Sequence, residues 1–384
     1  MISNNTGIGF MSFIANRLNH FDSSDFRKAI ERQQDLVNPI DLSVGLPEEL
    51  TAKHIKNAGI KAIKDNHTKY TPSNGIPELR AAIAKKNLQD NKLIHHHPDN
   101  VTIVPGLTTG QLLVYLATLD PGDEVIVFDP FYPPYTSVAN MVGAHVVYSP
   151  TLPDFQPNLS LVEASITNRT KMIIVNSPNN PSGAVYPEAT LRKIAKIAEE
   201  HNLLVVSDEI YENFVYGDKK HFSIGSIYPN TLTMNGFSKE FAMTGWRVGY
   251  ISGPKDIIDA INELQQYTIM SSSSIAQYAA LAAMSKRVPL NGKYLKKREF
   301  VISELNKLGL DVHGADGAYY IFFKSPNGLT DLEFVNLASE HNLILVPGRA
   351  FSRRSGYVRL SYGADMKSVK KGIEILKVIL EELS

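Results

Sequence analysis

The feature that most constrains the fold of this chain is an alternation of short apolar runs with helical patterns between residues 100 and 252. Helical patterns such as Thr109–Leu119 and Ala189–His201 separate several of these runs. Strands that alternate with helices imply βαβ units and a mainly parallel sheet, and runs that are apolar throughout are typical of strands covered on both faces. We therefore expect an α/β fold with a mostly parallel seven-stranded sheet. The expected strands are Val101–Val104, Glu124–Phe128, His145–Tyr148, Met172–Val175, Leu203–Ser207, Thr231–Met234 and Val248–Ser252.

The C-terminal part of the chain has a different pattern and predicts a second, smaller α+β domain. One long helical stretch runs from about residue 255 to Met284. A prior of about 150 residues per domain allows two or three domains. We expect a large domain over residues 46–285 and a small domain formed by both chain ends, residues 1–45 and 286–384. Its helices are expected at Asn291–Leu308, Asp331–His341 and Asp365–Leu383, and its strands at Ala318–Phe323, Ile344–Val346 and Tyr357–Tyr362.

Composition excludes several classes of protein. The sequence has no cysteine, which excludes disulfides, thiolate catalysis and thiolate metal sites. Lys plus Arg and Asp plus Glu both number 39, and this zero net charge argues against nucleic-acid or anionic-membrane partners. No run reaches about 18 apolar residues, and residues 1–16 lack a basic segment followed by an apolar run. We expect a cytoplasmic protein without a membrane span.

One histidine-rich run, His95–His97, raises the question of a metal site. It lies in a loop context, between a charged helical stretch and an expected strand. A solvated turn is the better interpretation, because metal sites combine several ligands at suitable spacing. We therefore expect no metal site in this chain.

Ligands of open α/β sheets bind at the carboxyl ends of the strands, so the residues after each expected strand are candidates for a site. Lys239 follows one such strand, where a desolvated lysine offers a neutral amine for a Schiff base, although most lysines are solvated. Asp208 follows another, where its carboxylate needs a cationic partner such as a protonated heterocycle, unless it only caps a helix. Ser238 and Arg247 could hold a dianionic phosphate.

Three further strand ends carry candidate residues. The turn Gly106–Thr108 opens a helix and presents backbone N–H groups suited to a phosphate, although such turns often only connect elements. Tyr132 could stack on a planar ring or pack a rigid proline turn. Asn180 lies in a run of turn formers, and its amide could donate a hydrogen bond into a pocket at the strand ends.

These motifs together resemble those of the class I and II pyridoxal-phosphate-dependent aminotransferases. The stretch Gly236–Gly249, which includes Ser238, Lys239 and Arg247, matches the family's lysine-attachment signature at each constrained position. Other stretches agree with the family in their order along roughly residues 40–365. They are Asp41–Pro47, Tyr70–Gly75 followed by Leu79–Arg80, Ser177–Gly183, Asp208–Tyr211 and Val358–Ser361.

The resemblance implies fold type I and a reaction that moves an amino group from an L-amino acid to a 2-oxo acid. The reaction would pass through a Lys239 aldimine of pyridoxal 5'-phosphate and through pyridoxamine phosphate. Lys239 would also move the proton, and Asp208 would pair with the pyridine nitrogen of the cofactor. The remaining cofactor contacts implied by the family are Tyr211 and Asn180 to the phenolic oxygen, Tyr132 against the ring, and Ser238, Arg247, Leu107 and Thr108 around the phosphate.

The resemblance also implies substrate and partner contacts. Arg359 would bind the α-carboxylate of the substrate, with Gly45 and Asn180 beside it. Tyr70 resembles the tyrosine that reaches the phosphate of the neighbouring subunit, which implies a homodimer with shared active sites. The same cofactor serves C–S lyases and other α/β-elimination enzymes of this fold, and these remain the alternative activity. A DNA-binding regulator does not fit, since only about 40 residues precede the motifs and the net charge is zero.

Departures from the family pattern bear on the substrate. Thr108 stands where aspartate-type relatives often carry Lys, Gln or Ser. The segment Asn5–Phe10, which often closes over the substrate in this family, has no charged residue. Without a clear second cation we expect a neutral or apolar amino donor, in an enzyme of amino-acid biosynthesis. Arg353 and Arg354, in an unusually basic loop, could reverse that preference.

Overall fold

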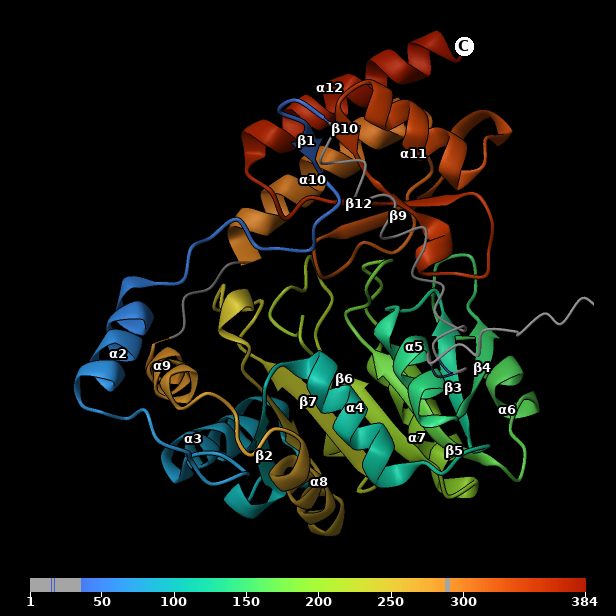
Figure 1. Cartoon of the computed structure of the whole chain (residues 1–384). Coiled ribbons are helices and arrows are strands. Elements are labelled where there is room, and N and C mark those ends of the chain that lie inside the picture. Colours follow the sequence, from blue (N-terminus) through green and yellow to red (C-terminus); the bar gives the residue numbers. More distant parts are fainter. Residues whose placement is uncertain (1–14, 16, 18–35, 287–290) are drawn as a thin grey trace, which may run out of the picture.

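The computed structural model describes residues 15, 17, 36–286 and 291–384, and a seven-stranded sheet lies at the centre of its larger part (Figure 1). Strand order is β2-β8-β7-β6-β5-β3-β4. Neighbours from β7 to β4 pair in parallel, whereas β8 runs antiparallel to both β2 and β7. The expected mostly parallel seven-stranded sheet is thus confirmed. Its strands are β2 Val101–Val104, β3 Glu124–Asp129, β4 His145–Pro150, β5 Thr170–Asn176, β6 Leu204–Asp208, β7 Thr231–Gly236 and β8 Gly249–Ser252.

Helices cover both faces of this sheet. Successive side chains of a strand point to opposite faces, so Val125 and Val127 of β3 pack in one apolar cluster and Ile126 packs in another. The first cluster includes buried residues of α4, α5 and α8, and the second includes those of α7. Burial on both sides explains why the strands are apolar throughout. The helices concerned are α4 Leu107–Thr118, α5 Pro134–Val142, α6 Leu159–Ala164, α7 Glu188–Glu200 and α8 Lys255–Thr268.

A third helical layer lies beyond β2, formed by α2 Lys53–Lys64, α3 Pro77–Lys86 and α9 Ser274–Ser285. The last turn of α3 continues into a wider π-helical turn, Asn87–Asn91. The single helical stretch expected up to Met284 is wrong: α8 and α9 are separate helices. Met270 has a positive φ of 63°, and the Ser273 side chain caps α9 by accepting from the N–H of Ala276.

The smaller part of the molecule contains strands from both chain ends. β1 (Ile40–Asp41) pairs in parallel with β10 (Leu343–Ile344), which places the blue N-terminal strand among red C-terminal elements in Figure 1. The strand expected at Ile344–Val346 is two strands, because β10 and β11 (Val346–Pro347) belong to different sheets. The other elements are β9 Tyr320–Lys324, β12 Tyr357–Ser361, α10 Asn291–Lys307, α11 Asp331–Glu340 and α12 Met366–Glu382.

One large apolar cluster joins these elements, with Tyr319, Leu360 and Val369 among its buried members. The expected boundaries of the two domains stay a prediction, and most of residues 1–35, including Asn5–Phe10, lie outside the described residues. Among the residues that are described, no helix is both long and apolar enough to cross a membrane.

Candidate active site

The carboxyl ends of the parallel strands and the smaller part of the molecule together line a cavity of about 610 Å³. Strand β6 delivers Asp208 to it, the turn after β7 delivers Ser238 and Lys239, and β12 delivers Arg359. Every site residue expected from the sequence lines this cavity except Tyr70. The others are Gly45, Leu107, Thr108, Tyr132, Asn180, Asp208, Tyr211, Ser238, Lys239, Arg247 and Arg359.

Asp208 is a buried carboxylate, with only 5% of the residue exposed. It accepts hydrogen bonds from the Tyr135 hydroxyl at 2.8 Å and from the backbone N–H of Ile210 at 3.1 Å. Burial raises the pKa of Asp208 to about 6, and the charge of Glu209 adds to this, while both hydrogen bonds oppose it. Among the described residues Asp208 has no salt-bridge partner, so a protonated ring nitrogen fits beside it.

Lys239 is the amine of the cavity. Its Nζ donates to the carbonyl oxygen of Gly45 at 2.6 Å. Burial lowers the pKa of Lys239 to about 8, and the charges of Arg359 and Arg247 lower it further, against an opposing effect of Asp208. A lysine with this pKa is partly neutral near pH 7 to 8, which is what both Schiff-base chemistry and proton transfer require.

An anion cradle lies where α4 begins. Gly106 precedes the helix with a φ of 82°, and a Cβ added there would lie 2.3 Å from Nη2 of Arg247. Only glycine therefore lets this guanidinium approach the helix N-terminus. Backbone N–H groups at the start of α4, the hydroxyl of Ser238 and the guanidinium of Arg247 are donors suited to a phosphate.

Arg359 is a second buried cation, with 5% of the residue exposed. Its Nη1 donates to Oδ1 of Asn180 at 3.0 Å, and its Nη2 donates to the carbonyl oxygen of Ser43. Its guanidinium lies over the rings of Tyr320 and Phe351. The buried Nε has no hydrogen-bond partner among the described residues. A guanidinium held in this way, with a donor still unused, is suited to a carboxylate.

Tyrosines complete the cavity, and Tyr135 and Tyr320 among them have contacts that the sequence does not reveal. The Tyr320 hydroxyl lies 2.8 Å from the Tyr211 hydroxyl, and Tyr319, outside the lining, donates to the carbonyl oxygen of Gly45 at 3.0 Å. Burial and the neighbouring Tyr320 raise the pKa of Tyr211, so its hydroxyl keeps its proton and can donate. Tyr135 stands in the aromatic run after β3, which is its only sequence signal.

A phosphorylated pyridine cofactor fits these residues. The carboxylate of Asp208 can accept from a ring N–H, the donors at the start of α4 can bind the phosphate, and Nζ of Lys239 can bond to an aldehyde carbon. The individual residue roles stay predictions. Tyr70 lies outside the cavity with 82% of the residue exposed, so its expected role requires a second copy of the chain.

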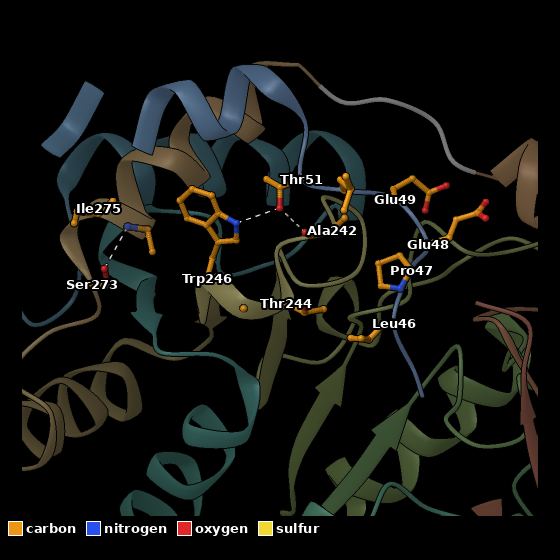
Figure 2. Close-up of a pocket in the computed structure, with 13 residues that line it drawn as sticks. Leu46, Pro47, Glu48, Glu49, Thr51, Ala242, Thr244, Trp246, Ser273 and Ile275 are labelled. Carbon is orange, nitrogen blue, oxygen red and sulfur yellow. Dashed lines mark hydrogen bonds between the residues drawn. The ribbon is translucent and has the colours of Figure 1, made fainter. Parts of the chain in front are cut away.

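A second hollow, of about 690 Å³, lies between the segment Leu46–Thr51, Trp246 and the start of α9 (Figure 2). Trp246 Nε1 donates to Thr51 Oγ1 at 3.1 Å, and Thr51 Oγ1 donates to the carbonyl oxygen of Ala242 at 2.6 Å. Its carboxylates, Glu48 and Glu49, already pair with lysines of α10. It therefore offers a groove rather than a reactive centre.

Comparisons with known proteins place the chain in one family. Residues 37–376 match the family model described as aminotransferase class I and II. The chain is 38% identical over 358 residues to a probable aspartate/prephenate aminotransferase of Thermus aquaticus, which covers 90% of this chain and 93% of that protein. A single mutant of Thermus thermophilus aspartate aminotransferase superposes with a TM-score of 0.91 at 36% identity, covering 96% of this chain and 100% of that one. The Thermus thermophilus enzyme with maleate gives a TM-score of 0.89 at 35% identity, with the same coverage.

The charges around Lys239 lead to a prediction for the cofactor-free protein. Competitive labelling with acetic anhydride, read by peptide mass spectrometry, should give Lys239 a pKa near 8, against about 10.4 for solvated lysines. Arg359→Met removes a like charge and should raise this pKa, whereas Asp208→Asn removes an opposite charge and should lower it. Arg354→Met, outside the cavity lining, should leave it unchanged. Shifts of the same sign in the first two variants would contradict this electrostatic account.

Proposed function

This chain belongs to the family of class I and II aminotransferases and is a pyridoxal-phosphate-dependent transaminase of fold type I, and we propose that the cavity at the strand ends is its active site. The observation that carries the proposal is the convergence of one amine, one buried carboxylate and two anion-binding arginines in a single cavity. When bound, pyridoxal phosphate supplies an electron sink that acidifies the Cα–H bond of an amino acid. The protein supplies binding, orientation and proton transfer.

The cofactor contacts follow from the charges of the lining residues. Asp208, ionised above its pKa of about 6, holds a proton on the pyridine nitrogen. The hydroxyl of Tyr211 and the amide of Asn180 donate to the phenolic oxygen. The cradle of Arg247, Ser238 and the N–H groups of Leu107 and Thr108 binds the phosphate, and Tyr132 covers one face of the ring.

Two residues act on the amino and oxo acids. Arg359 binds the α-carboxylate through its guanidinium and thereby fixes the position of Cα, with Gly45 and Asn180 beside it. Nζ of Lys239 would accept the proton from Cα of the substrate and donate it to the bound cofactor, and would carry it back when the oxo acid is converted to an amino acid. Its pKa of about 8 lets the same atom accept and donate a proton near neutral pH.

For the side chain of the substrate we propose an acidic group instead of the neutral one expected from the sequence. The relative from Thermus aquaticus is named for aspartate and prephenate, and the solved Thermus thermophilus structure contains the dicarboxylate maleate. Arg353 lines the cavity, with its guanidinium 4.6 Å from the ring centroid of Tyr148 and its Nη2 donating to the Tyr148 hydroxyl at 2.9 Å. Its backbone N–H donates to Asp129 at 2.9 Å, which ties the loop to the end of β3.

Aromatic side chains lie between Arg359 and Arg353. Phe351 lies under the guanidinium of Arg359, and its carbonyl oxygen accepts from the N–H of Phe131 at 2.8 Å. Phe131 in turn packs on Tyr148, with ring centroids 5.3 Å apart. Arg349 also lines the cavity, but Asp331 holds its guanidinium in a two-pronged contact. We assign Arg353 to a second carboxylate, because it lines the cavity and Tyr148 holds its guanidinium.

We further propose a cytoplasmic homodimer with shared active sites, in amino-acid biosynthesis. The absence of cysteine suits a reducing compartment. Exposed apolar side chains support a second copy: Leu50 is 85% exposed beside the hollow of Figure 2, and Tyr267 is 83% exposed. A second copy would also bring Tyr70 to the phosphate.

Purified protein with pyridoxal phosphate tests the activity. Borohydride reduction should couple the cofactor to Lys239 alone, as read by peptide mass spectrometry. An L-amino acid should convert the bound cofactor to pyridoxamine phosphate, and a 2-oxo acid should reverse this. Lys239→Ala should lower kcat/KM by about 10³-fold, the size of a general acid–base contribution. A label on another lysine, or release of ammonia and a 2-oxo acid without an acceptor, would contradict the proposal, the second in favour of a lyase.

Substrate panels test the role of Arg353. Arg353→Gln should raise KM for aspartate or glutamate about tenfold, because a charged hydrogen bond is lost, and should leave a neutral donor unaffected. Arg354→Gln is the matched control, since its guanidinium bonds to Thr151 and lies outside the cavity lining. Equal losses in both variants, or a wild-type preference for neutral donors, would exclude the assignment.

Sedimentation measurements test the dimer. The mass in solution should be twice the 42.5 kDa of one chain. Leu50→Glu should shift the chain toward monomer, because it places a charge in the proposed interface, whereas Leu161→Glu on α6 should not. Tyr70→Phe should keep the dimer and weaken cofactor binding. A wild-type monomer that binds the cofactor fully would refute shared active sites.

A further inference from the structure

A cluster of buried charged side chains lies directly beside the cavity. Asp208 and Tyr211 line the cavity, whereas Glu209 and Glu212, in the same turn after β6, are absent from its lining. Their carboxylates meet Lys86 at the end of α3, Asn91 at the end of the π-helical turn, and His221 in the loop that follows. We call these five residues the buried cluster. The activity proposed above does not use it.

Hydrogen bonds fix both carboxylates of the buried cluster. Oε1 of Glu209 accepts from the hydroxyls of Ser207 at 2.9 Å and Ser223 at 2.6 Å. Oε2 of Glu209 lies 3.0 Å from Nε2 of His221. Glu212 forms an ion pair with Lys86 and accepts from Nδ2 of Asn91 at 2.6 Å. Glu209 is 1% exposed and the side chain of Glu212 is 7% exposed, so water compensates neither carboxylate to a useful extent.

Charge balance in the buried cluster depends on the imidazole. Two carboxylates face one ammonium, so a neutral His221 leaves one buried negative charge uncompensated, and an imidazolium completes the balance. Burial lowers the pKa of His221, but the charge and hydrogen bond of Glu209 and the charge of Glu212 outweigh it and raise the pKa overall, against Lys86. The groups that face the ring are therefore Glu209, Glu212 and Lys86.

A metal ion is the competing use of these residues. Ligand atoms of Glu209, Glu212 and His221 lie within 4.8 Å of one another. The ammonium of Lys86 already provides the positive charge that a metal ion would bring, since it contacts Glu212 and donates to Oδ1 of Asn91 at 2.6 Å. The cluster is accordingly an ion-pair network.

The charge of Glu209 affects the cavity through the adjacent residue, Asp208. Glu209 follows Asp208 directly, and its negative charge raises the pKa of the Asp208 carboxyl. An imidazolium on Glu209 reduces that effect, which favours the ionised form of Asp208. Resting on the role proposed for Asp208, we propose that His221 is a positioning residue. Its imidazolium neutralises Glu209, keeps Asp208 ionised and holds the Asp208–Tyr211 turn in place for the cofactor.

Affinity of the cofactor-free protein for pyridoxal phosphate tests this role. His221→Gln keeps a hydrogen-bonding group but loses the charge, and should weaken binding about tenfold, the equivalent of one pKa unit at Asp208. The double variant His221→Gln/Glu209→Gln removes the charge that needs balancing and should regain most of the affinity. His341→Gln is the matched control, because His341 pairs with Glu382 at 3.2 Å on the smaller part of the molecule.

The outcomes separate this inference from the proposed function. Wild-type protein that neither binds pyridoxal phosphate on Lys239 nor transaminates would refute the proposed function. Wild-type protein that does both, with His221→Gln equally tight or with a double variant no tighter than the single one, overturns only the inference. The second result would mean that His221 merely fills space.

Nuclear magnetic resonance on the unmodified holoenzyme decides the point if His221→Gln fails to fold. With ¹³C-labelled histidine, the His221 ring should be protonated at pH 7. His221→Asn provides an alternative variant for the assignment. A neutral His221 ring at pH 7 would overturn the inference regardless of the behaviour of any variant.

Discussion

The constraint on which the rest of the site depends is the burial of one carboxylate, Asp208, at the end of β6. A buried charge must be compensated, and within the described part of the chain neutral donors do this, Tyr135 and the N–H of Ile210. A carboxylate compensated in this way suits a ligand that brings a protonated nitrogen, which is the role that we propose for it.

The cations of the cavity are placed so that each serves a different anion. Arg247 lies against Gly106 at the start of α4, and Arg359 lies on the aromatic rings of Tyr320 and Phe351. Both charges, together with burial, lower the pKa of Lys239. The cations to which we assign a phosphate and a carboxylate thus add to the effect of burial on the amine, because like charges destabilise an ammonium ion.

Sequence reasoning reached the large sheet and most of the site for one physical reason. Parallel strands buried on both faces are apolar along their whole length, so β5 and β6 can be recognised in the sequence. The residue after each strand must then lie at the edge of the sheet where ligands bind. This rule made Asp208 and Lys239 candidates, although a helix cap and a solvated lysine stayed open as alternatives for them. The sequence pattern did not predict the break between α8 and α9, because four successive serines fit a helix as well as a turn. In the structure, Ser273 caps α9. Likewise β10 and β11 form one apolar run in sequence, although they pair in different sheets.

The sequence by itself determined the fold class, the family and four of the charged side chains that line the cavity, Asp208, Lys239, Arg247 and Arg359, because these depend on local pattern and motif order. Only the tertiary structure decided which groups meet across long separations. Tyr135 reaches Asp208, Arg359 reaches Ser43 and Asn180, and Arg353 reaches Tyr148. It also decided that Lys86 and His221, far apart in the chain, balance Glu212 and Glu209 behind the strand end. Such pairs follow from packing, in which buried charges must find partners wherever the fold brings them, and no local periodicity records that choice.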